Sequence, residues 1–129
     1  MMARREAATS PRRTAKQSAG DAAEERAARH LAERGLAIVA RNYRTRLGEI
    51  DLVAREGETL VFVEVRQRAS AHFGGAAASI DHRKRARIES AARQFLSRLA
   101  QEPPCRFDVV AVDDGHAEWI RGAFEAEHD

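Results

Sequence analysis

The sequence is poor in cysteine, and it contains no long apolar run. Cys105 is its single cysteine, so an intramolecular disulfide is excluded and a reducing compartment is expected. The five histidines show no spacing typical of zinc ligands, so no zinc site is predicted. No stretch approaches the ~20 apolar residues that a membrane helix needs, and no apolar segment follows the basic N-terminus as in a secretory signal. We therefore expect a cytoplasmic protein without membrane contact.

The length of 129 residues is sufficient for one hydrophobic core and indicates one folded domain. Residues 1–19 are small, polar and basic, and we predict a disordered arm there. An α/β domain is expected over 20–125, followed by an acidic tail at 126–129.

The formal net charge of +2 conceals an uneven distribution of charge along the chain. Residues 1–20 carry five basic side chains and one acidic one, a sum of +4, so the rest of the chain carries −2. Residues 66–98 carry eight basic side chains and two acidic ones, a sum of +6. Such a block is compatible with a polyanion-binding surface, but on charge alone a solvated helix face is the preferred interpretation, because basic runs are common on exposed helices.

Hydrophobic periodicity predicts alternating helices and strands. One helix is expected over 21–34 with Asp21 as its cap, and a second over 80–99 with Ser79 as its cap. Strands are expected over 36–44, 48–54, 59–66, 106–112 and 118–120. The order αβββαββ indicates an α/β domain with a mixed sheet of four to five strands flanked by helices.

The hairpin formed by the second and third strands carries the acidic residues of interest. With a four-residue turn, the simplest register pairs Ala54 with Thr59 and places Glu49 opposite Glu64. Asp51 then lies diagonal to Glu64 on the same face, which Arg66 shares. The opposite face is wholly apolar and must be buried; it consists of Ile50, Leu52, Val61, Val63 and Val65.

Carboxylates that face one another across a hairpin repel, and a hard divalent cation such as Mg²⁺ would relieve that repulsion. Such an ion could polarise a phosphodiester and generate hydroxide from water. The same residues also fit the solvated face of a hairpin, with Glu64 paired to Arg66. Glu24 on the first helix could add a further carboxylate, and it could also form a capping box with Asp21.

Six short motifs and a characteristic ending occur in order over residues 20–124. They are Gly20-x-x-x-Glu24, Arg41-Asn42-Tyr43-Arg44, Gly48-Glu49-Ile50-Asp51-Leu52-Val53, Val61-Phe62-Val63-Glu64-Val65-Arg66, Phe73-Gly74-Gly75-Ala76, Arg106-Phe107-Asp108-Val109-Val110 and Trp119-Ile120-Arg121-x-Ala123-Phe124. Together they resemble the YraN family of bacterial proteins. That family is similar in plan to the PD-(D/E)XK nuclease-like superfamily, which includes archaeal Holliday-junction resolvases and restriction enzymes.

The resemblance implies a restriction-endonuclease-like core in which Asp51 and Glu64 bind Mg²⁺ or Mn²⁺. It also implies that Glu24 matches the acidic residue that some superfamily members place on the first helix. Where the superfamily has a lysine two residues after the glutamate, this chain has Arg66. Arginine stays charged and cannot act as a base, but it can stabilise charge on a phosphate. Lys84 could supply the missing amine.

Basic residues near the predicted hairpin and on the second helix are the candidate phosphate contacts: Arg41, Arg44, Arg46, Lys84, Arg85 and Arg87. Three functions stay open on the sequence. The first is a metal-dependent endonuclease acting on DNA, and the second is a non-catalytic nucleic-acid-binding module on the same fold. The third is a protein-interaction scaffold that uses the acidic C-terminal segment. Nucleic acid, most of all DNA, is the expected partner, and the oligomeric state is left open.

Overall fold

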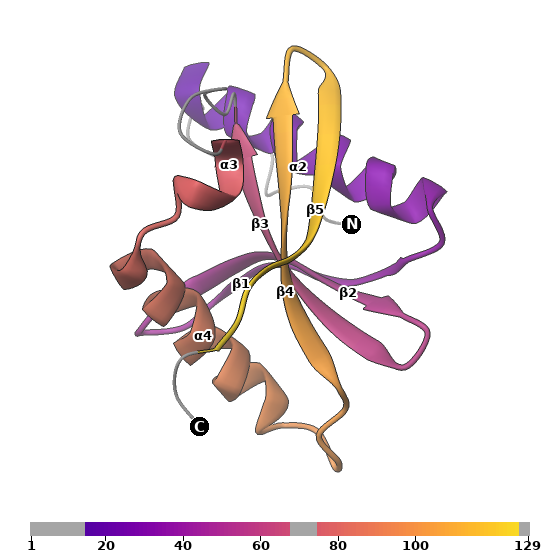
Figure 1. The fold of residues 1–129 in the computed structure, drawn as a ribbon, viewed down its shortest axis with the longest axis vertical. Helices are drawn as coiled ribbons and strands as arrows, with labels where there is room; N and C mark the ends of the chain where they lie inside the picture. Colours follow the sequence, from indigo (N-terminus) through magenta and orange to yellow (C-terminus); the bar gives the residue numbers. More distant parts are fainter. Residues whose placement is uncertain (1–14, 68–74, 127–129) are drawn as a thin grey trace, which may run out of the picture.

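The computed structural model describes residues 15–67 and 75–126 (Figure 1). Its elements are, in order, α2 (Ala15–Glu33), β1 (Ala37–Arg44), β2 (Glu49–Glu56), β3 (Thr59–Gln67), α3 (Gly75–Ala78), α4 (His82–Leu96), β4 (Cys105–Asp113) and β5 (His116–Phe124). This succession confirms the predicted order αβββαββ, with the four-residue helix α3 as an addition before α4.

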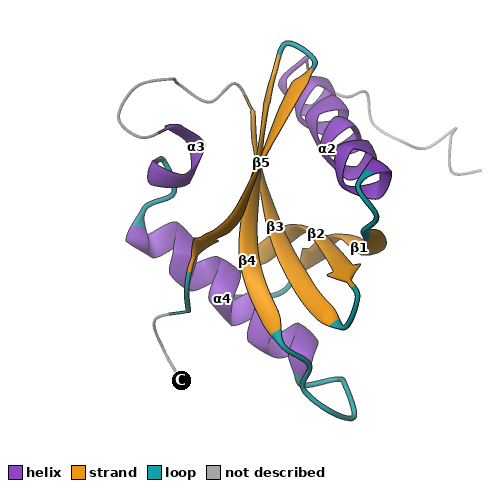
Figure 2. Cartoon of the chain, turned by 45° about the vertical axis from the view of Figure 1, so that its right-hand side comes forward, coloured by secondary structure: helices purple, strands orange, loops and turns teal. Residues whose placement is uncertain are grey.

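The five strands form one mixed sheet in the order β1-β2-β3-β4-β5. Neighbouring strands are antiparallel except β3 and β4, which are parallel and are joined through α3 and α4. Parallel neighbours require such a crossover connection. Helix α2 covers one face of the sheet and α4 covers the other (Figures 1 and 2). The predicted α/β class, with a mixed sheet flanked by helices, is therefore confirmed.

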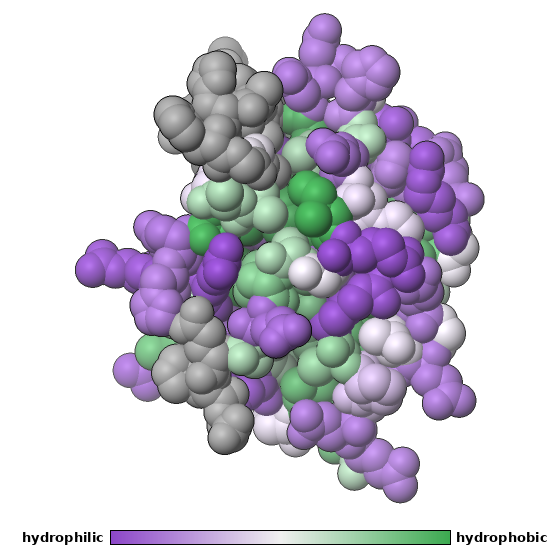
Figure 3. Space-filling view, viewed as in Figure 1, coloured by the Kyte–Doolittle hydropathy of each residue, from purple (hydrophilic) through white to green (hydrophobic). Residues whose placement is uncertain are grey.

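Two hydrophobic clusters, one on each face of the sheet, hold the layers together. Phe62 and Val109 pack toward α4, whereas their strand neighbours Val63 and Val110 pack toward α2. The face that includes β5 carries apolar residues in its middle with hydrophilic ones around them (Figure 3). Strands that are buried on both faces leave no water for a polar side chain, so any carboxylate within them needs a protein partner.

Helix α2 begins earlier than predicted. Its first residue is Ala15 rather than one next to Asp21, so Asp21 lies inside the helix and the capping-box interpretation of Glu24 is wrong. Residues 15–19 of the predicted arm are consequently helical, and residues 1–14 lie outside the described part of the chain. Ala15, Lys16, Gln17 and Ala19 are good helix formers, so the helix extends over them despite Gly20.

Helix α4 is shorter than predicted, and a different residue caps it. The Asp81 carboxylate accepts a hydrogen bond of 2.8 Å from the Lys84 backbone N–H, so Asp81 and not Ser79 is the cap. Leu99, the last residue of the predicted helix, lies beyond its end and is 39% exposed.

The β2–β3 hairpin turns more tightly than predicted. Pairing continues to Glu56 and Thr59, so only Gly57 and Glu58 form the turn. Gly57 has a φ of 61°, a conformation that glycine adopts without steric cost. A two-residue turn with positive φ matches the twist of the flanking strands, which explains why the tighter turn is preferred.

The tighter turn shifts the hairpin register by two residues. Ala54 pairs with Val61 rather than with Thr59. The prediction that Glu49 faces Glu64 is therefore wrong. Continuing the observed register by one residue beyond its last pair brings Asp51 opposite Glu64. Because a shift of two residues preserves the alternation of faces, the two carboxylates still lie together.

The regular alternation of β1 and β2 breaks beside Asp51. On β1, Asn42 has a φ of 51°, in the left-handed region that asparagine tolerates better than most residues. On β2, Ile50 was predicted to share a face with Leu52, but it packs with Val53 in the cluster beneath α4. Asp51 thus occupies the point where the strand stops alternating.

A second buried carboxylate, Asp108, supports the β4–β5 pairing where its register shifts. It is fully buried and accepts hydrogen bonds from Arg106 Nε at 2.9 Å, Trp119 Nε1 at 2.8 Å and the Gly122 N–H at 2.9 Å. The Arg106 guanidinium also pairs with Glu56 at 2.8 Å. These contacts satisfy a charge whose burial would otherwise be costly, so Asp108 is a structural acid.

Gly48 allows the β1–β2 turn to approach helix α4. A Cβ atom at this position would overlap the backbone carbonyl of Arg87. The turn and the helix therefore meet backbone to backbone, which fixes the start of β2 relative to α4.

The substitution Gly48→Ala is expected to destabilise the protein by at least about 2 kcal/mol, because the helix backbone cannot move aside without disturbing the core beneath it. Gly20→Ala is a matched control, since an added Cβ there meets nothing within 4 Å and replaces a glycine inside α2. It is expected to be neutral or slightly stabilising. Urea denaturation of both variants measures the difference, and equal stabilities would contradict the close approach.

Candidate functional site

The centre of the candidate site is a pair of carboxyl groups, Asp51 on β2 and Glu64 on β3, which we call the carboxylate pair. The two side chains are hydrogen-bonded to each other. Asp51 Oδ2 also accepts a hydrogen bond of 2.8 Å from the backbone N–H of Val65. The observed pairing of β2 with β3 ends at Leu52 and Val63. Beyond that point the Asp51 side chain, rather than a strand backbone, accepts the hydrogen bond of the Val65 N–H. Glu64 is only 5% exposed.

Two cationic side chains reach the same oxygen of the carboxylate pair. Lys84 Nζ on α4 and Arg66 Nη1 on β3 each lie 3.5 Å from Glu64 Oε2. Arg66 Nε also donates to Ser79 Oγ at 3.1 Å, which ties the end of β3 to the segment that precedes α4. The predicted Glu64–Arg66 pairing is therefore present, and Lys84 joins it from the helix.

Burial makes the carboxylate pair easier to protonate than isolated carboxyls. The pKa of Glu64 is raised to about 7, first by burial and then by the neighbouring Asp51, while Lys84 and Arg66 oppose the rise. Burial also raises the pKa of Asp51, against the Val65 N–H, which lowers it. Both carboxyl groups therefore keep a proton to a higher pH than isolated carboxyls do, and the protonation of each affects that of the other.

Glu24 approaches the carboxylate pair from helix α2. It is half-buried, and its pKa is raised by burial and by the charge of Asp51. A side-chain hydrogen bond from Asn42 lowers the pKa of Glu24 and so opposes this rise. Helices on opposite faces thus contribute to one site, Glu24 from α2 and Lys84 from α4. Asn42 was not singled out from the sequence, where only its tolerance of a left-handed backbone could have marked it.

Glu49 does not belong to the carboxylate pair. It is exposed and pairs with Arg44 across the strands at 3.4 Å. The interpretation of a solvated hairpin face is therefore correct for Glu49 and wrong for Glu64, which is buried, whereas Asp51 is half-buried and hydrogen-bonded to the Val65 N–H.

The candidate phosphate contacts divide into engaged and exposed side chains. Arg41 pairs with Glu25 at 2.9 Å. Arg85 turns inward, donates to the carbonyl of Ile80 at 3.0 Å and lies over the Phe124 ring at 5.2 Å. Arg85 therefore stabilises the start of α4 rather than facing solvent.

Arg46 and Arg87 lie at the surface, beside one another in the fold. Arg46 is in the exposed β1–β2 turn, and Arg87 is the residue of α4 that this turn contacts through Gly48. Arg83 is exposed one helical turn before Arg87. Arg83 and Arg87 lie within one helical turn of Lys84, whose ammonium group contacts Glu64.

The carboxylate pair has the chemistry of a small divalent-ion site. Within the described residues, no three His, Cys, Asp or Glu side chains come together as a metal-binding group. Mg²⁺ is nevertheless commonly held by one or two carboxylates, with waters and substrate phosphates completing the shell. Asp51 and Glu64 fit that donor set, since their two carboxyl groups lie together at the point where β2 and β3 separate.

The profile of the group described as "Uncharacterised protein family UPF0102" matches residues 23–112. The chain is 58% identical over 117 residues to a UPF0102 protein of Albidiferax ferrireducens, covering 88% of this chain and 91% of the relative. It is 54% identical over 112 residues to one of Cupriavidus pinatubonensis, covering 86% and 88%. The chain belongs to the UPF0102 family. The resemblance to the YraN family is thereby confirmed, because the two names denote one family.

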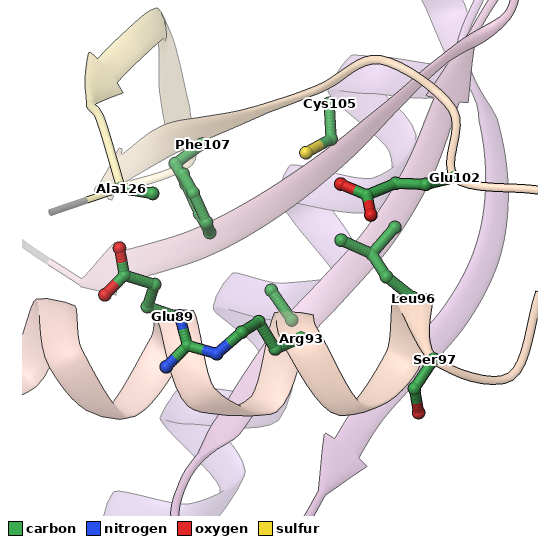
Figure 4. Close-up of a pocket in the computed structure, with 9 residues that line it drawn as sticks. Glu89, Arg93, Leu96, Ser97, Glu102, Cys105, Phe107 and Ala126 are labelled. Atoms are coloured by element: carbon green, nitrogen blue, oxygen red, sulfur yellow. The ribbon is translucent and has the colours of Figure 1, made fainter. Parts of the chain in front are cut away.

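This UPF0102 protein has a separate pocket of about 340 Å³ at the far end of α4 (Figure 4). It is lined by Glu89, Arg93, Glu102, Cys105 and Phe107, among others. Partial burial and the nearby Glu102 raise the pKa of the Cys105 thiol, which disfavours the reactive thiolate. No described helix of this UPF0102 protein is long and apolar enough to cross a bilayer.

The raised pKa of Glu64 predicts a pH-dependent stability for this UPF0102 protein. Protonated Glu64 contributes stability that is fully present below its ordinary pKa of 4.5 and is lost as the pH rises through about 7. In Glu64→Gln this loss is absent. Between pH 4.5 and 7.5 the free energy of unfolding of the variant therefore rises by on the order of 2–3 kcal/mol relative to that of wild type.

Urea denaturation across this pH range measures the difference between the two proteins. Glu49→Gln, on the exposed part of the same hairpin, is the control and should follow the wild type. Parallel curves for wild type and Glu64→Gln would show that Glu64 carries no proton in the folded protein.

Proposed function

We propose that this protein binds nucleic acid, DNA above all, and hydrolyses phosphodiester bonds with Mg²⁺ or Mn²⁺ at the carboxylate pair. The observation that carries the proposal is the contact between the half-buried Asp51 and the buried Glu64, with Lys84 and Arg66 at one Glu64 oxygen. Burying two acids side by side is unfavourable for folding, and perturbed carboxyl pairs of this kind are characteristic of functional sites.

Each residue of the site has a defined task in this proposal. Asp51 and Glu64 would hold the cation, which when bound polarises a phosphodiester and lowers the pKa of bound water. Lys84 and Arg66 hold positive charge beside Glu64, where it can stabilise negative charge on the phosphate during transfer. Arg66 does not act as a base, because a guanidinium keeps its proton. Glu24, on the α2 side, adds a third carboxyl group close enough to Asp51 for their charges to interact.

The exposed arginines supply the attraction for a polyanion. Arg46, Arg83 and Arg87 lie on one side of the carboxylate pair, on the β1–β2 turn and on α4. Basic side chains grouped on one surface bind phosphates irrespective of sequence and release counterions on binding. Binding is therefore expected to weaken steeply as the salt concentration rises.

The second candidate is a nucleic-acid-binding protein without catalytic activity, in agreement with the alternative drawn from the sequence. It is favoured by a specific observation: Lys84 and Arg66 each lie 3.5 Å from Glu64 Oε2 and supply positive charge there without a metal ion. In this alternative the carboxylate pair anchors β2 to β3 and α4, and the arginines alone perform the function. The restriction-endonuclease-like succession of elements is compatible with both candidates, since fold does not determine activity.

Cleavage of labelled DNA in Mg²⁺ or Mn²⁺ distinguishes the two candidates. Asp51→Asn and Glu64→Gln are expected to lower the cleavage rate by about a hundredfold or more, because each removes a ligand from the metal site. Both variants should bind DNA as tightly as wild type in the presence of EDTA. Glu49→Gln is the matched control and should cleave normally.

The two candidate functions predict different results in this assay. Salt-sensitive binding without cleavage in wild type, on duplex and single-stranded substrates alike, would favour the non-catalytic candidate. Absence of both binding and cleavage at low salt would contradict both candidates.

A further inference from the structure

The β1–β2 turn presents a large apolar side chain to solvent. Leu47 is 69% exposed, more than the other large apolar residues found exposed in the described chain, Val39 at 45% and Leu99 at 39%. Leaving a leucine in water forgoes the stabilisation that its burial would provide. Single exposed apolar residues are common on proteins, so the setting of Leu47 decides whether it is informative.

The turn that carries Leu47 is held rigidly. Thr45 Oγ1 accepts hydrogen bonds from the N–H groups of Leu47 at 3.2 Å and Gly48 at 3.0 Å, and the Thr45 N–H donates to the Gly48 carbonyl at 2.8 Å. Gly48 in turn lies against the backbone of Arg87 on α4. A turn fixed at its base and against a helix presents its apex residue in one orientation, so little conformational entropy is lost when Leu47 is inserted into a partner.

Arginines lie close to the apex of the turn along the backbone. Arg46 precedes Leu47 directly, and Arg87 lies where the turn meets α4. Arg44 lies at the end of β1, where Glu49 at 3.4 Å partly offsets its charge. An exposed apolar side chain with arginines nearby is complementary to a nucleic acid, whose phosphates surround apolar, stacked bases.

We propose that Leu47 is a wedge that inserts between adjacent bases of duplex DNA while Arg46 and Arg87 contact the flanking phosphates. This inference rests on the proposed nucleic-acid binding and deepens it by naming the feature that the protein recognises. Apolar side chains that enter a base step unstack it and bend the duplex. Lys84, one helical turn before Arg87, contacts Glu64, so the disturbed step would lie next to the carboxylate pair.

The proposal defines a substrate class. Unstacking requires less free energy where the base step is already weakened, as at a mismatched pair. The protein should therefore bind duplex DNA with a mismatch more tightly than the fully paired duplex of the same length. Phosphate contacts alone would give no such preference, because the two duplexes carry the same charge.

Fluorescence of 2-aminopurine placed at a central mismatch tests the wedge directly, because this base brightens when it is unstacked. The assay is performed in EDTA at low salt, so that no cleavage intervenes. Wild type is expected to raise the fluorescence and to prefer the mismatched duplex several-fold. Leu47→Ala should lose both effects and bind the mismatched duplex about tenfold more weakly. Leu47→Met should restore them.

Leu99→Ala is the matched control, since it truncates another exposed leucine beyond the far end of α4 and should behave as wild type. If wild type binds DNA without raising the fluorescence, or if Leu47→Ala matches wild type, the wedge is refuted while nucleic-acid binding stands. If wild type binds neither duplex, the wedge and the proposed function both fail.

Discussion

The arrangement of the site depends on the contact between two carboxyl groups, the buried Glu64 and the half-buried Asp51, at the point where β2 and β3 separate. Two acids can be neighbours in a dry environment only if they share a proton, bind a cation or are compensated by basic side chains. Lys84 and Arg66 supply positive charge at one oxygen of Glu64, and burial raises the pKa of both carboxyl groups. The sheet therefore contains an acidic contact whose burial has to be compensated by its neighbours.

Much of the surrounding structure supports this contact. The separation of β2 from β3 beyond Leu52 frees the Val65 N–H for Asp51. The left-handed residue Asn42 interrupts β1 opposite that point and holds Glu24 toward it. On the other face, the cap of α4 at Asp81 sets the start of the helix that carries Lys84. Both helix layers thus converge on the place where the sheet is least regular.

The sequence was sufficient to predict the order of elements and the proximity of Asp51 to Glu64, because alternation fixes which residues share a face. It could not decide the register, since turns of two and four residues give the same alternation. It could not separate Arg85, which turns inward, from Arg87, which stays exposed, because both lie in one basic run of α4. A break in alternation at a single residue such as Asn42 leaves no periodic signal at all.

Calorimetric titration of Mn²⁺ into the wild type and into the double variant Asp51→Asn/Glu64→Gln tests the central claim most directly. The substitutions keep the shape of both side chains, so the variant should remain folded, and Glu49→Gln controls for the loss of an exposed carboxylate. The account predicts that wild type binds Mn²⁺ and that the double variant loses at least about tenfold in affinity. Equal binding by both proteins, or no binding by the wild type, would contradict the assignment of the carboxylate pair as a cation site.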